Sequence, residues 1–89
     1  MKKIVTVIEM GTLLQTFTLI DESGNIERKL EIPIDNIPET IAYYAHENKI
    51  NEIQIFGKSN YTSKIKDKVI SKSQRDYGHA NYTILLKEI

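Results

Sequence analysis

The chain has 89 residues, 40% of them hydrophobic, and a formal net charge of zero. This length allows one domain, residues 1–89, and the hydrophobic fraction is enough for a modest core, which excludes a disordered tail. Because cysteine is absent, disulfides, thiolate catalysis and zinc–thiolate sites are excluded too. Glu9 and Gly11 interrupt the first apolar stretch, so we expect no signal peptide, no membrane span and a cytoplasmic location.

Charge is distributed unevenly along the chain. Residues 1–57 contain five basic residues (Lys or Arg) and nine acidic residues (Asp or Glu). Residues 58–75 contain six basic residues and one acidic residue, and residues 76–89 contain one basic and two acidic residues. Such asymmetry bears on the choice of partner rather than on the fold.

The first part of the chain predicts an antiparallel meander. Residues 3–10 have apolar side chains at both odd and even positions, so both faces of the strand would be buried, which is typical of a central strand. Gly11 supplies a turn. A second strand covers 13–20, and the turn at 21–25 leads into a third strand at 26–32. In this third strand, alternation assigns one face to Ile26, Arg28, Leu30 and Ile32. The other face carries acidic and basic residues, which indicates an edge strand.

The second part alternates helices and strands. Pro33 ends the third strand, Asp35 or Asn36 can cap a helix that reaches residues 48–49, and 50–57 is a short strand. A second helix is predicted from about 61 to 75, Gly78 breaks it, and 82–89 is the last strand. We therefore predict an α/β fold of order β-β-β-α-β-α-β, an α+β mixed sheet of five strands whose right-handed crossovers place both helices on one face.

Three short motifs follow the turns of this pattern. Glu9-Met10-Gly11-Thr12 closes the first strand, residues 20–26 form the second hairpin, and residues 53–57 lead through Gly57 into a helix. With the order of elements, they resemble the ribonuclease H-like fold shared by the actin-like ATPases. The resemblance covers nearly the whole chain as topology. It implies a site where carboxylates from the first and fourth strands and from helices hold two divalent ions.

The carboxylates that this resemblance implies are not matched. Only Glu9 stands at a matching position, residues 53–56 contain no acid, and the family's final helix has no counterpart. One carboxylate cannot assemble a two-metal site, so we expect no enzyme activity, no metal and no cofactor, with Glu9 a solvated side chain at a strand end. His46 is expected to face solvent, and His79 has no second His or Cys nearby, so neither indicates a metal ligand or a catalytic base.

The second helix carries the clearest binding signal. At about 100° per residue, its basic side chains fall in one sector with an aromatic at its edge: Lys64, Lys68, Lys72, Arg75 and Tyr61. Such a stripe suits a nucleic-acid backbone, although a solvated helix face would read the same way. The preceding Gly57-Lys58-Ser59 could attract a phosphate at the helix start, but no upstream glycine makes it a P-loop.

The sheet offers a second surface. With both helices on one face, the other face lacks a cover, and alternation assigns to it Val5, Val7, Phe56 and Leu85, with Glu27, Lys29 and Glu31 at its rim. The first hypothesis is thus a non-catalytic module that contacts nucleic acid. The alternative is a protein-interaction module, most simply a homodimer, and the least favoured is a degenerate nuclease or phosphotransferase.

Overall fold

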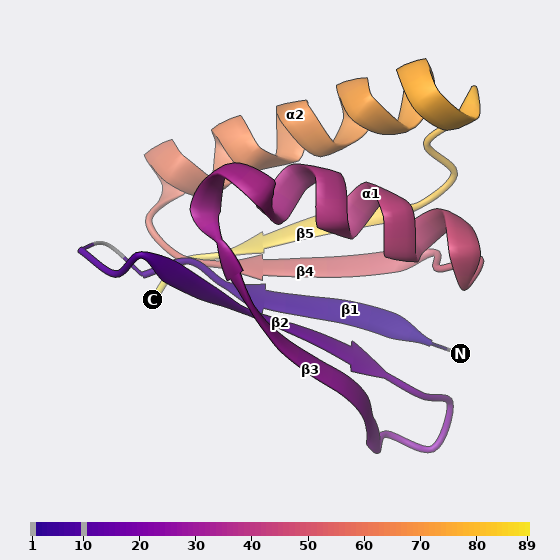
Figure 1. Cartoon of the computed structure of the whole chain (residues 1–89), viewed down its shortest axis with the longest axis horizontal. Helices are drawn as coiled ribbons and strands as arrows, with labels where there is room; N and C mark the ends of the chain where they lie inside the picture. The colour runs from indigo at the N-terminus through magenta and orange to yellow at the C-terminus, as the bar shows by residue number, and fades with distance from the viewer. Residues whose placement is uncertain (1, 10) are drawn as a thin grey trace.

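One mixed sheet and two α-helices make up the described part of the chain, residues 2–9 and 11–89 of a computed structural model (Figure 1). The strands are β1 (Lys3–Val7), β2 (Leu14–Ile20), β3 (Ile26–Pro33), β4 (Glu52–Phe56) and β5 (Thr83–Lys87). The helices are α1 (Ile37–Glu47), preceded by a 3-10 turn, η1 (Ile34–Asn36), and α2 (Ser59–Tyr77). The predicted order is confirmed, and the first predicted strand reaches Met10, which lies outside the described residues.

The strand order of the sheet is β3-β2-β1-β4-β5. β1 pairs with β2 and β2 with β3 in antiparallel fashion, whereas β4 pairs in parallel with both β1 and β5. This confirms a mixed five-stranded sheet with β1 at its centre, as expected for a strand with apolar residues on both parities. Among the described strands, β3 and β5 form the two edges.

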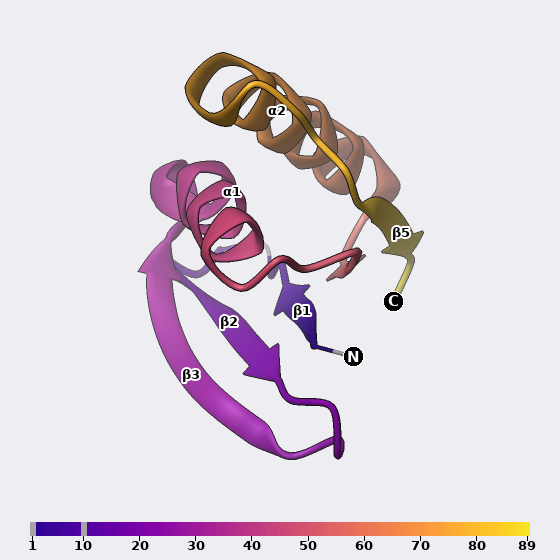
Figure 2. The same cartoon turned by 90° about the vertical axis from the view of Figure 1, so that its right-hand side faces the viewer.

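Both helices lie on the same face of the sheet (Figure 2). Alternate residues of the strands point toward them, and the central ones, Ile4, Phe17, Ile53 and Ile55, are fully buried. The helices contribute Ile37, Ile41, Ile65 and Val69 to the same core. A single apolar layer between sheet and helices therefore holds the fold together.

The ends of the helices follow from their sequence. α1 has Pro38 in its first turn and Asn36 at the cap position, although the Asn36 side chain makes no capping hydrogen bond. α2 extends two residues beyond the predicted range at each end and stops at Gly78, whose φ of 78° is the left-handed conformation that ends helices. Within the described residues, neither helix combines the length and the apolar character that crossing a membrane requires.

The β2–β3 pairing corrects the predicted side of Ile26. An irregularity near Ile20 makes Leu19 pair with Arg28 but Ile20 pair with Ile26. Because one extra residue reverses the alternation, Ile26 joins Ile20 on the face away from the helices and is 62% exposed. Arg28 stays on the helix side, where its guanidinium carbon lies 5.9 Å from the ring centroid of Tyr44.

Candidate functional site

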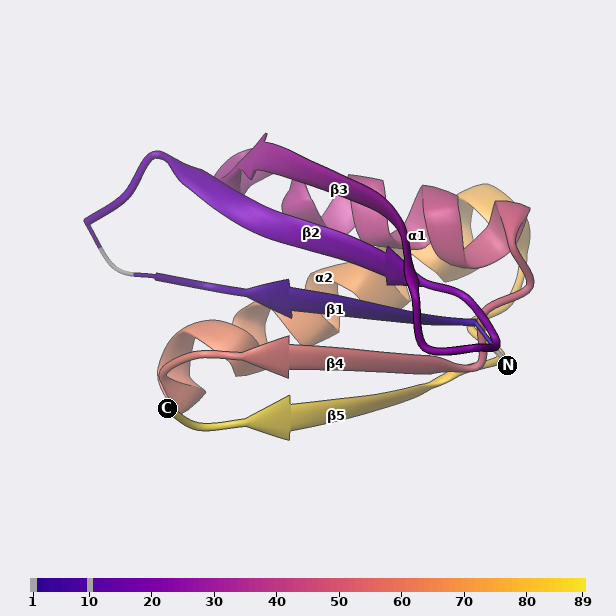
Figure 3. The ribbon, with the colours of Figure 1, turned by 90° about the horizontal axis from the view of Figure 1, so that it is seen from below.

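Among the described elements, no helix or further strand covers the face of the sheet opposite the helices, and only the β2–β3 turn crosses it, in front of the start of β1 (Figure 3). The strand register places Val5, Gln54 and Leu85 side by side in one row across β1, β4 and β5. Val7, Phe56 and Lys87 form the next row. Val5, Val7 and Phe56 thus lie together, while Gln54 separates Val5 from Leu85. We call this surface the open face and define it by Val5, Val7, Phe56 and Leu85.

Polar residues surround this apolar centre. On the β2–β3 side, Thr16 stands opposite Glu31 and Thr18 opposite Lys29, so two of the predicted rim charges are in place. Glu27, the third, forms an ion pair with Lys2, with 3.0 Å between Nζ and Oε2. Leu85 is 39% exposed, and the other three apolar side chains of the open face are half-buried. An apolar centre with a polar rim is the usual anatomy of a contact surface.

A hollow of about 590 Å³ lies at the end of the open face where β1, β4 and β5 begin. Lys3 and Glu52 pair across β1 and β4 there and give it opposite charges. Ile20 and Leu85 provide the apolar part of its lining, and the β2–β3 turn adds Asp21, Glu22 and Gly24. The open face is therefore recessed and charged at one end rather than uniformly apolar.

The basic stripe on α2 is partly balanced by acids. Lys64, Lys68 and Arg75 are exposed and Lys72 is half-buried. Arg75 pairs with Asp76 at 3.0 Å between Nε and Oδ1, and this hydrogen bond lowers the pKa of the Asp76 carboxyl. Lys68, Lys72 and Arg75 also share a shallow groove with Asp35 and Asp67.

Tyr61 belongs to the core more than to the stripe. Its ring is half-buried and packs against the apolar cluster between helices and sheet. Lys64, Lys68 and Lys72 form no ion pair within the described residues. The structure therefore presents a lysine surface on α2, with the aromatic ring turned inward.

The Gly57-Lys58-Ser59 turn is shaped by close packing. Gly57 is buried with φ 155°, and its N–H donates to the Lys87 carbonyl at 2.9 Å. The Lys58 carbonyl accepts the N–H groups of Tyr61 and Thr62, each at 3.0 Å, while no side chain caps the helix. The arrangement explains the glycine structurally, and whether the turn binds phosphate stays a prediction.

Glu9 lies just after β1 with an exposed side chain. Its backbone is fixed by buried Gln15, whose Oε1 accepts the Glu9 N–H at 2.7 Å and whose Nε2 donates to the Glu9 carbonyl at 3.3 Å. In residues 2–9 and 11–89, no three His, Asp or Glu side chains come close enough to share a metal ion. Glu9 is thus held in place without partners for metal chemistry.

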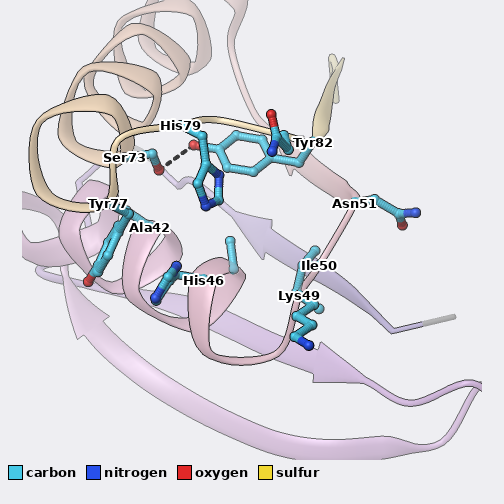
Figure 4. Close-up of a pocket in the computed structure, with 11 residues that line it drawn as sticks. Ala42, His46, Lys49, Ile50, Asn51, Ser73, Tyr77, His79 and Tyr82 are labelled. Atoms are coloured by element: carbon cyan, nitrogen blue, oxygen red, sulfur yellow. Dashed lines mark hydrogen bonds between the residues drawn. The ribbon is translucent and has the colours of Figure 1, made fainter.

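A separate pocket of about 290 Å³ opens where α1 and α2 end (Figure 4). His46 of α1 stacks on Tyr77 of α2, with ring centroids 4.2 Å apart, and the His79 ring lies 5.8 Å from that of His46. Deeper in the pocket, the Tyr82 hydroxyl donates to Ser73 Oγ, and burial raises the pKa of Tyr82. Burial also raises the pKa of Tyr77.

Sequence reasoning missed this pocket. His46 is exposed, as predicted, but His79 has a second histidine beside it in space, which corrects the statement that none is nearby. His46 belongs to α1 and His79 to the connection between α2 and β5, and no motif or spacing links them. The one sequence signal for this pocket is the pair of helix ends, because the pocket lies where α1 ends at Asn48 and α2 ends at Gly78.

No protein-family model matches this chain, and no curated protein matches it significantly.

Proposed function

We propose that this chain is a small non-catalytic interaction module whose open face packs against a second copy of itself. The observation that carries the proposal is the gathering of Val5, Val7, Phe56 and Leu85 on the one sheet face without a cover among the described elements. Apolar side chains gathered on an uncovered surface commonly mark an interface. The isolated, exposed Glu9 supports the non-catalytic part.

The register supports self-association. β1 and β4 are parallel neighbours, with Lys3 beside Glu52 and Val7 beside Phe56. A two-fold axis in the interface, running between these strands and along them, would set Lys3 over Glu52 of the second copy and Val7 over its Phe56. Each of these two contacts would occur twice. The same two-fold rotation therefore brings opposite charges together and apolar side chains together. Packed sheets keep their strands within about 30° of alignment, as this arrangement requires.

Light scattering over a range of protein concentrations tests this proposal. We expect the mass of wild type to rise with concentration and Phe56→Lys to shift the rise to higher concentration, because the substitution places a charge at the centre of the contact. Ser63→Lys adds the same charge to an exposed position on α2 and should leave the mass unchanged. Equal masses for wild type and Phe56→Lys at every concentration would reject it.

A second candidate function is contact with a nucleic-acid backbone through Lys64, Lys68 and Lys72. The observation that favours it is that these lysines form no ion pair within the described residues. Phosphate groups would then displace only counterions from this side of α2. The acids that neighbour Lys68, Lys72 and Arg75 would weaken the attraction at that end.

For the fold, we propose membership of the ribonuclease H-like architecture. Support comes from three antiparallel strands followed by two parallel strands in the order β3-β2-β1-β4-β5. An experimental structure superposed on nucleases and actin-like ATPases is the test.

A further inference from the structure

The two edges of the sheet differ in their protection against pairing. β3 carries four charged residues, is irregularly paired near Ile26 and ends at Pro33. Charges, bulges and proline are the devices by which proteins prevent an exposed edge from pairing with another strand. The β3 edge is therefore built to remain unpaired.

Of these devices, β5 has only a single charge, that of Lys87. Its sequence is Thr-Ile-Leu-Leu-Lys, without proline and with one charge at its end, and no irregularity interrupts its pairing with β4. Figure 3 shows it along the outer border of the sheet, with no other described segment beside it. Leu85 and Leu86, which point to opposite faces, are 39% and 37% exposed. A flat apolar edge of this kind is a template for another strand.

The hydrogen bonds to β4 fix which backbone groups of β5 are free to pair. The Thr83 N–H donates to Asn51, and the Lys87 carbonyl accepts from Gly57, both at 2.9 Å. Because these groups alternate along a strand, the N–H and C=O of Ile84 and Leu86 point outward, away from β4. The edge thus offers two donors and two acceptors at two alternate residues.

We propose that two copies of this chain join edge to edge through antiparallel β5 strands, about a two-fold axis at Leu85 perpendicular to the sheet. Ile84 then faces Leu86 of the second copy, and the two residues exchange both backbone hydrogen bonds, as an antiparallel ladder requires. Leu85 faces its own equivalent. Thr83 faces Lys87, so no two lysines meet. The strand is self-complementary in this register, which favours a second copy over a foreign strand.

This contact is independent of the one proposed for the open face. Its axis is perpendicular to the sheet, whereas the axis of the open-face contact lies in the plane of that interface. If both contacts form together, the assembly does not close, because the open-face axis runs between β1 and β4 whereas the edge axis lies beyond β5, so the two axes do not meet.

Leu86→Pro tests the edge contact most cleanly. Proline removes an N–H that faces solvent in the single chain, so the β4–β5 hydrogen bonds remain, and edge strands tolerate it in this position. Leu86→Ala is the matched control, because it removes the side chain but keeps the N–H. Circular dichroism checks that the variants are folded. If Leu86→Pro unfolds, Leu86→Lys replaces it, because this variant keeps the N–H but places a charge between the two β5 strands.

Light scattering at one high concentration separates the two contacts. We expect Leu86→Pro to fall to the mass of the open-face dimer, Leu86→Ala to keep the larger mass of wild type, and Phe56→Lys combined with Leu86→Pro to be monomeric. A folded Leu86→Pro with the mass of wild type would overturn the edge contact. So would a monomeric Phe56→Lys single variant, which would leave the open face as the interface. Monomeric Leu86→Pro with dimeric Phe56→Lys would instead remove the open-face contact and keep the edge.

Discussion

Gly57 lies so close to Ile8 that an added β-carbon would be 2.9 Å from the Ile8 carbonyl oxygen. The same β-carbon would be 3.1 Å from the Thr62 side chain, so the residue that follows β1 and the first turn of α2 meet at Gly57. Since φ is 155°, a side chain is disfavoured here by conformation as well as by space.

We therefore predict that Gly57→Ala lowers the free energy of unfolding by about 2–5 kcal/mol, from backbone strain and overpacking together. Gly24→Ala is the control: its φ is 87° but nothing lies within 4 Å, so only the conformational cost of about 1–2 kcal/mol remains. Urea denaturation of both variants measures the difference. Equal losses would show that the contact with Ile8 contributes nothing.

Tyr82 supplies a pH-dependent contribution to stability. Its hydroxyl donates to Ser73 and approaches the Val69 carbonyl at 3.3 Å, and burial raises its pKa above the ordinary value of about 10. A raised pKa in the folded state means that the protonated hydroxyl stabilises the fold fully below about pH 10 and that this contribution is lost as pH rises through the folded pKa.

Tyr82→Phe should cost about 1 kcal/mol at neutral pH, because Ser73 Oγ loses its partner. It should also flatten the decline in unfolding free energy above about pH 10, because the buried hydroxyl that titrates there is gone. Urea titrations at several alkaline pH values give both quantities. If the unfolding free energy of Tyr82→Phe declines with alkaline pH as steeply as that of wild type, the decline comes from groups other than Tyr82.

The order of elements could be predicted because alternation, Pro33 and Gly78 act locally. The side of Ile26 could not, because it depends on the β2–β3 turn, where Asp21 Oδ1 accepts the N–H groups of Ser23 and Asn25. The Asp and Asn of such a turn indicate where the turn lies but not the strand register that it imposes.

The candidate surfaces also divide into features that the sequence predicts and features that it does not. Alternation was enough to place the open-face residues, since a strand has only two sides. The inward position of Tyr61 depends on the packing of α2 on the core, Asp35 reaches the basic stripe from η1, and His79 meets His46 where the two helices end. The pattern of a single helix contains none of these contacts. Gln15 illustrates this: a polar residue on the buried side of β2, 1% exposed, is explained only by its bonds to Glu9 and Thr12.

If α2 binds nucleic acid, its affinity should fall steeply with salt, with a slope of about −0.9 per phosphate contacted on duplex DNA. Changing Lys64, Lys68 and Lys72 to Glu should abolish binding without unfolding, because these side chains lie outside the core. The matched control changes Lys29, Lys49 and Lys87 to Glu, which alters net charge equally at exposed positions elsewhere. Fluorescence anisotropy at low salt is the assay, and no binding by wild type would end this hypothesis.

We expect no turnover of DNA, RNA or ATP with Mg²⁺ or Mn²⁺, since exposed Glu9 has no neighbouring carboxylates to complete a metal site within the described residues. Labelled substrates and purified protein are sufficient for the assay. Metal-dependent turnover that Glu9→Ala removes, while Glu22→Ala retains it, would contradict the non-catalytic proposal.

The most direct test of the open-face contact is an NMR experiment on a mixture of two differently labelled samples of the chain, in which only contacts between copies give signals. We predict signals that join the Val7 methyl groups of one copy to the Phe56 ring of another, together with contacts from Val5. Signals confined to β5, or none between copies at high concentration, would contradict the assignment of the open face as the surface through which this module associates.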